Sequence, residues 1–126
     1  MSFPTPSTMN TSKVSLATAN AKRDGTDTTG VGFTAGGSGS TLLHIKIKAK
    51  GATTEGMVRG FKVFGGVKDL WIEQPIPERN AGDIERLGTY ETVLTFEDEH
   101  LESGWTLEFS TQKAEQFAVH CVGEDY

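Results

Sequence analysis

The sequence predicts an all-β domain: an antiparallel two-sheet sandwich of about eight strands, jelly-roll-like, with a closed barrel as the alternative. The first observation is the strict two-residue alternation of residues 41–51, TLLHIKIKAKG. The second is that similar pieces recur about every ten residues between glycine-rich turns, which is typical of sandwiches. The third is a composition of 15 glycines, 4 prolines and 36% hydrophobic residues, which suits a chain rich in turns.

Length and charge limit the classes of function. A chain of 126 residues is one domain's worth and buries roughly two-thirds of its unfolded surface. The formal charge of −5 argues against a nucleic-acid partner, because neutralising phosphates needs an excess of Lys and Arg. The N-terminal residues lack the features of a secretion signal, and no segment has membrane-spanning length, so we expect neither export nor a membrane partner.

The N-terminal part divides into an arm, two strands and a polar loop. Residues 1–12 are mostly Ser, Thr, Pro, Asn and Met, and we interpret them as a flexible or subunit-contacting arm ahead of a single sandwich domain over residues 13–126. A strand is expected from Val14, followed by a polar loop over residues 20–29. Residues 30–35 form a glycine-rich second strand, which we expect to make a hairpin with the strand that follows.

The strand at residues 41–50 has one apolar and one basic face. Leu43, Ile45, Ile47 and Ala49 alternate with His44 and three lysines, so we place the first set in the core and the second in solvent. The next strand, over residues 57–64, has apolar side chains on both faces. Gly65-Gly66 predicts a hairpin to a strand at residues 67–74, which ends before the prolines at 75 and 77.

The last third of the chain returns to alternation after one irregular stretch. Residues 77–89 have a single turn of apolar spacing interrupted by glycine. We interpret them as a loop, with a short helix as the alternative. Strands are then expected over residues 90–96, 105–111 and 117–122.

Candidate chemistry is sparse. The segment GVGFTA at residues 30–35 matches a dinucleotide fingerprint, but no helix can start after it, so we expect no nucleotide. His44, His100, His120 and Cys121 lack zinc-site spacing, and Cys121, the single cysteine, is expected to be a small buried hydrophobe. The acidic side chains near residues 24–27 and 97–102 lack the spacing of a calcium loop. We therefore expect no cofactor, no metal and no enzymatic activity.

The two tryptophans are assigned to different environments. Trp105 shares a strand face with Leu107 and Phe109, and we expect it in the core. Trp71 shares a face with Glu73 and is the better candidate for an exposed aromatic, at an interface or on a sugar ligand.

Five features carry a resemblance to known proteins. They are the TAN-x-x-RDGT turn at residues 18–26, the glycine-broken strand that follows it, TTEGMVRGF at 53–61, ESGWTLEFST at 102–111 and the closing VGEDY at 122–126. Together they resemble small virion-associated proteins of tailed bacteriophages, some of them capsid decoration or cement proteins. The resemblance covers about residues 14–126, and its motifs are turns and strand edges without a catalytic signature.

The resemblance implies a non-enzymatic β-sandwich that forms oligomers, with a trimer favoured, and binds the outer lattice of the major capsid protein to stabilise the head. The location implied is the capsid exterior of a virion assembled in the host cytoplasm. The alternative is a phage tail, fibre or head-spike module that binds host glycans through exposed aromatic side chains. The residues proposed to contact the capsid or another subunit are Phe3, Pro4, Pro6, Lys46, Lys48, Lys50, Arg59 and Trp71.

Overall fold

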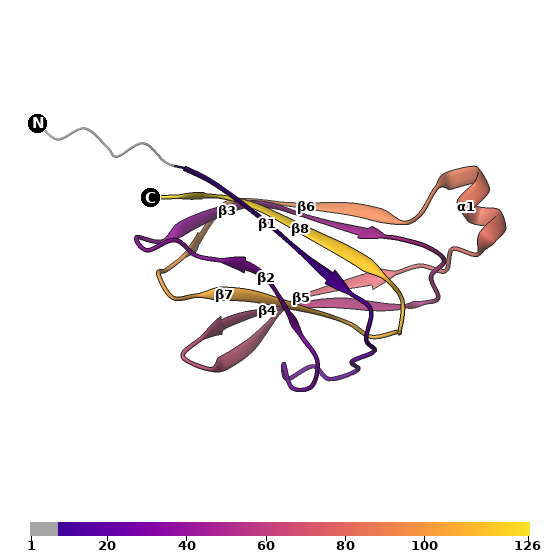
Figure 1. The fold of residues 1–126 in the computed structure, drawn as a ribbon, viewed down its shortest axis with the longest axis horizontal. Coiled ribbons are helices and arrows are strands. Elements are labelled where there is room, and N and C mark those ends of the chain that lie inside the picture. Colours follow the sequence, from indigo (N-terminus) through magenta and orange to yellow (C-terminus); the bar gives the residue numbers. More distant parts are fainter. Residues whose placement is uncertain (1–7) are drawn as a thin grey trace, which may run out of the picture.

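A computed structural model describes residues 8–126, which form eight strands and one short helix. The elements are β1 (Thr8–Leu16), β2 (Gly30–Thr34), β3 (Ser40–Ala49), β4 (Gly56–Phe64), β5 (Val67–Ile76), α1 (Ala81–Leu87), β6 (Glu91–Leu101), β7 (Thr106–Thr111) and β8 (Phe117–Asp125). Figure 1 shows two layers of strands, with α1 at one end of the molecule and the C-terminus at the other.

The two sheets have the strand order of a jelly roll. One sheet has the order β1-β8-β3-β6 and the other β2-β7-β4-β5, and every pairing between strands is antiparallel. The first strand therefore pairs with the eighth, the second with the seventh, the third with the sixth and the fourth with the fifth. Such nested pairing is what results when one long antiparallel hairpin is rolled into a sandwich. The predicted fold class is confirmed.

The core lies between the sheets and contains the apolar face of β3. Ile45, Ile47 and Ala49 are fully buried, as the alternation predicted. At the start of β3 the prediction was wrong by one residue, because the pairing register shifts between Leu42 and His44. Leu42 is therefore buried and Leu43 only half-buried. A bulge of this kind inserts one residue and changes which face the preceding side chains occupy.

Two further expectations need correction. Strand β2 pairs with β7, and β3 lies in the other sheet, so β2 and β3 do not form a hairpin. The glycine-rich segment at 36–39 instead carries the chain from one sheet to the other. Strand β1 begins at Thr8, and each of its residues pairs with β8, so residues 8–12 belong to the sandwich and not to an arm.

The hairpin at Gly65-Gly66 is confirmed. Both glycines have positive φ, 59° and 80°, and Phe64 pairs with Val67 across the turn. Two successive positive φ values are what a tight two-residue hairpin requires, and glycine adopts them without steric cost.

The irregular stretch at 77–89 contains a helix, so its interpretation as a loop was wrong. Asn80 caps the first turn by accepting from the Asp83 backbone N–H at 3.0 Å, while the Asp83 carboxylate accepts from the Asn80 backbone N–H at 3.0 Å. This reciprocal capping box satisfies two backbone donors that a short helix otherwise leaves unpaired. Gly88 ends the helix.

The polar segment between β1 and β2 is tied to the β2-β7-β4-β5 sheet. Ala19 forms an isolated bridge with Thr111, and Arg23 Nε lies 3.2 Å from Glu73 Oε2. Glu73 also accepts from Arg59 Nε at 3.1 Å. The TAN-x-x-RDGT turn is therefore a structural part of the sandwich.

Candidate functional site

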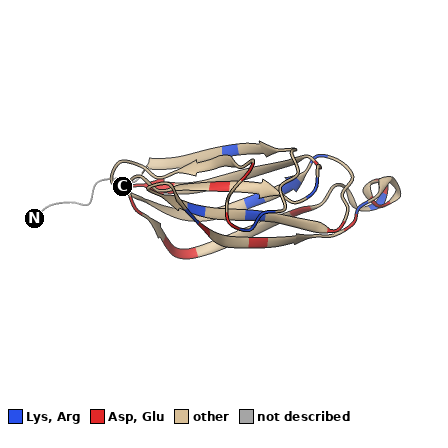
Figure 2. Ribbon diagram, turned by 90° about the horizontal axis from the view of Figure 1, so that it is seen from below, with Lys and Arg blue, Asp and Glu red and all other residues tan. Residues whose placement is uncertain are grey.

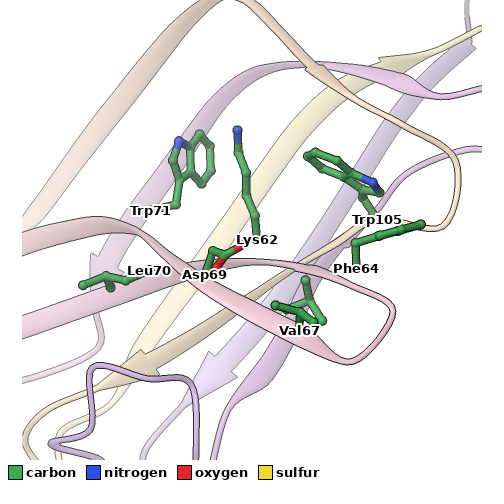
Figure 3. A pocket seen from close by; sticks show the side chains of 8 residues that line it. Lys62, Phe64, Val67, Asp69, Leu70, Trp71 and Trp105 are labelled. Carbon is green, nitrogen blue, oxygen red and sulfur yellow. The ribbon is translucent and has the colours of Figure 1, made fainter.

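An apolar concavity lies at the β4–β5 hairpin, where side chains from β4, β5 and the turn before β7 meet. Its apolar lining consists of Val63, Phe64, Val67, Leu70, Trp71 and Trp105; Lys62 and Asp69 also line it, and its volume is about 370 Å³. We call this site the hairpin groove. In Figure 3, Trp71, Lys62 and Trp105 rise side by side, and Phe64 lies against Trp105 near the tip of the hairpin.

The outer part of the hairpin groove is open to solvent. Phe64 is 57% exposed, Val67 62% and Leu70 39%. Large apolar side chains gathered on a soluble protein mark contact surfaces more often than single scattered ones do. Sequence reasoning did not select these three residues. The available signal was the apolar content of both faces of the strand that enters the Gly65-Gly66 turn.

Trp71 forms the inner wall of the groove and is held by two neighbours. Its ring stacks on Phe96 with centroids 5.2 Å apart, and Lys62 Nζ lies 4.6 Å from the indole centroid. Lys62 is itself paired with Glu99. Trp71 is therefore half-buried and fixed in orientation, and a sugar ring that stacked on it would have to compete with these partners.

Trp105 lies between the core and the groove. It packs against the core residues, as expected, but it is only partly buried and its ring centroid lies 6.0 Å from that of Phe64. Its indole Nε1 is buried without a hydrogen-bond partner among the described residues. Trp105 thus lines the groove with its ring while it packs on the core.

A second surface lies on the outer face of the β1-β8-β3-β6 sheet. Lys13 pairs with His120, and His120 pairs with Lys46, so the register places these three side chains in one row across three strands. Their neighbours on this face are His44, Lys48 and Lys50. We call these six residues the lysine face. The sequence predicted its β3 members, but Lys13 and His120 could be added only once the strand pairing was known.

The lysine face is partly neutralised at one edge. Lys46 Nζ and Lys48 Nζ lie 3.1 Å and 3.8 Å from Glu91 Oε2. The hydrogen bond and the charge of Lys46, together with the charge of Lys48, hold the pKa of Glu91 below its ordinary value. Lys50 Nζ donates to Ser15 Oγ at 3.0 Å. Figure 2, which views the molecule from the side of the other sheet, shows basic and acidic positions interspersed over the strands.

Arg59 was proposed as a contact residue, and the structure does not favour that role. Its side chain is 4% exposed, and its Nε donates to Glu73. Its Nη1, like Ser110 Oγ on the cross-strand partner, has no partner among the described residues. The guanidinium therefore faces the protein and cannot meet a partner surface without rearrangement. Phe3, Pro4 and Pro6 lie outside the described residues.

The structure does not gather the candidate metal ligands. Within residues 8–126, no group of three or more His, Cys, Asp or Glu side chains is placed to hold a metal ion. Cys121 is fully buried, and burial raises the pKa of its thiol to about 12, so it is an unreactive core residue as predicted. The same part of the chain contains no helix long and apolar enough to cross a bilayer.

These features define a jelly-roll sandwich with an open apolar groove at one hairpin and a basic face on the opposite sheet. The chain matches no model of a known protein family, and it matches no curated protein.

Proposed function

We propose that this protein is a non-enzymatic capsid decoration protein of a tailed bacteriophage that binds the outer surface of the major capsid protein lattice and stabilises the head. The observation that supports this role best is the presence of two separate contact surfaces, one apolar and one basic, on a small acidic sandwich. Two surfaces allow one chain to join copies of itself and to bind a shell at the same time.

The lysine face is the surface proposed to meet the shell. Three of its lysines lie on or next to β3 and Lys13 lies on β1, so one sheet presents them together. Positive groups arranged in this way favour an acidic partner surface and speed its association. Each contact is weak, but an oligomer that engages several capsid subunits gains affinity through effective concentration.

A glycan-binding module is the second candidate, and the tryptophans of the hairpin groove are the feature that favours it. Against it, Phe96 and Lys62 already contact the Trp71 ring, and the most exposed lining is Phe64 and Val67. An aliphatic and phenyl surface with few hydrogen-bonding groups is better suited to protein than to sugar. A glycan-array signal abolished by Trp71→Ala would favour this second candidate over decoration.

The decoration role is tested on particles. Heads assembled with and without this protein are compared by the release of packaged DNA during heating and osmotic shock. We expect particles that lack the protein to release DNA at a lower temperature and after a smaller shock, and re-addition of the purified protein to restore both. Equal survival of the two kinds of particle would refute the proposal.

A further inference from the structure

The hairpin groove lacks a cover within the described part of the chain. Phe64 and Val67, at the tip of the hairpin, are both more than half exposed. The walls behind them are fixed, because Trp71 is stacked on Phe96 and Trp105 packs on the core. A preformed apolar groove with rigid aromatic walls binds a partner without paying much ordering entropy.

The N-terminal segment has the composition that such a groove binds. Residues 1–7, MSFPTPS, contain one aromatic side chain and two prolines and no acidic or basic side chain. Because proline has no backbone N–H, a segment of this kind leaves few donors unsatisfied in an apolar site. Aromatic-lined grooves are the usual receptors for proline-containing segments. We propose that the hairpin groove binds residues 1–7 of a second copy of this chain, with Phe3 as the anchor.

The start of β1 lies at the same end of the sandwich as the groove. Thr8 pairs with Asp125, Ser40 pairs with both Asp125 and Leu101, and Leu101 ends the strand just before Trp105. Figure 1 shows that β1 begins at the end opposite to α1, where the β4–β5 turn also lies. Thr8, the first described residue, therefore lies at the end of the sandwich that carries the groove.

The distances favour a neighbouring copy over the same chain. Three strand spacings separate Thr8 from Leu101, about 14 Å, and the groove lies mostly in the other sheet, about 10 Å across, so the direct separation is about 17 Å. Five residues from Phe3 to Thr8 span at most about 17 Å when fully extended. Within one chain Phe3 would reach the groove only with its backbone almost fully extended, which costs conformational entropy, whereas a neighbouring copy imposes no such constraint, so we assign the segment to a second copy.

A cross-linking experiment tests the assignment. One chain carries Phe3→Cys and a second chain, of different mass, carries Val67→Cys, and the two are mixed under mild oxidation. The native Cys121 does not compete because it is fully buried. We expect a covalent dimer of the two different chains. The matched control pairs Phe3→Cys with Val31→Cys, since Val31 is a similarly exposed valine on β2 at 52%, and should not give this product.

A second measurement does not depend on engineered cysteines. Sedimentation should show wild-type self-association that weakens by about tenfold or more with Phe3→Ala, as expected for a central aromatic anchor, and stays unchanged with Ser7→Ala. A chain that starts at Thr8 keeps every strand, so circular dichroism should be unchanged while self-association is lost.

The assignment is overturned if the Phe3 and Val67 mixture gives no more dimer than the control. It is also overturned if a chain with both cysteines forms only an internal link, or if the chain without residues 1–7 associates like wild type. Neither measurement includes a capsid, so failure here is separate from failure of the decoration role.

Discussion

At the scale of single residues, the Asn20 side chain holds the polar segment between β1 and β2 through hydrogen bonds to its backbone. Its side chain is buried, with Nδ2 donating to the carbonyl oxygens of Thr26 and Thr28 at 2.9 Å and 2.7 Å. Its Oδ1 accepts from the Lys22 backbone N–H at 3.0 Å. One amide thus satisfies three backbone groups in a segment without helix or strand, which explains why an asparagine stands in the TAN-x-x-RDGT turn.

Asn20→Ala should lower the free energy of unfolding by about 1–3 kcal/mol, because the backbone groups it serves lose their partners. Asn20→Asp keeps the acceptor but loses both donated bonds, and should destabilise to a similar extent. Lys22→Ala is the control, since only the Lys22 backbone takes part, and should change stability by less than about 0.5 kcal/mol. Urea unfolding measures all three. A neutral Asn20→Ala would mean that the loop is held by its contacts with the sheet alone.

At the scale of elements, Glu108 joins three separate segments. It projects from β7, accepts a hydrogen bond from Thr29 Oγ1 beside β2, and lies 3.0 Å from Lys68 Nζ on β5. Burial acts to raise the pKa of Glu108, but the hydrogen bonds from Thr29 and Lys68 outweigh it, so the pKa lies below its ordinary value. The ionised form is therefore the one that the folded state prefers.

This preference predicts a pH dependence. Because the folded pKa is lowered, the stabilisation by Glu108 is complete above its unfolded pKa, about 4.3, and is lost as the pH falls through the folded value. Glu108→Gln should cost about 1 kcal/mol at pH 7. The stability difference from wild type should shrink toward zero below about pH 4. Chemical unfolding across this range measures it, and a difference that stays constant down to pH 3 would contradict the assignment to the charged form.

The elements also show what the sequence could and could not predict. Alternation identified β3 and its buried Ile45 and Ile47, because period-two burial is a local property of the chain. The bulge at Leu42 depends on the registers of β6 and β8, which are distant in sequence, so Leu43 was placed wrongly. The helix α1 begins with a capping box of Asn80 and Asp83. This local signal was present in the sequence, but the prediction considered only the apolar spacing and so favoured a loop.

The candidate site was only partly predictable for the same reason. Lys46 and Lys48 could be assigned to one face from their spacing alone. Lys13 and His120 joined them only through the pairing of β1 with β8 and of β8 with β3. The burial of Arg59, which does not favour its proposed contact role, could not be read from its own strand, because it follows from the pairing of β4 with β5 and β7 on either side.

At the scale of the whole molecule, the jelly roll separates the two contact surfaces. The lysine face lies outside the β1-β8-β3-β6 sheet, whereas the hairpin groove is built mainly from β4 and β5 of the other sheet. Nested pairing makes this possible, because it places the central hairpin, β4 and β5, in one sheet and the first and last strands, β1 and β8, in the other. Shell binding and self-association can therefore be altered independently by substitution.

The last prediction uses this separation. Lys46→Glu combined with Lys48→Glu should weaken particle binding by about tenfold or more, while leaving Phe3 to Val67 cross-linking unchanged. Thermal unfolding should shift only slightly, because the pairs with Glu91 that are lost lie at the surface, where ion pairs contribute little. Val67→Asp should abolish self-association and, by removing multivalency, also weaken particle binding. Lys22→Glu with Lys113→Glu changes the net charge equally and should affect neither. If this control weakens binding as much as the β3 pair does, net charge and not the lysine face determines attachment to the particle.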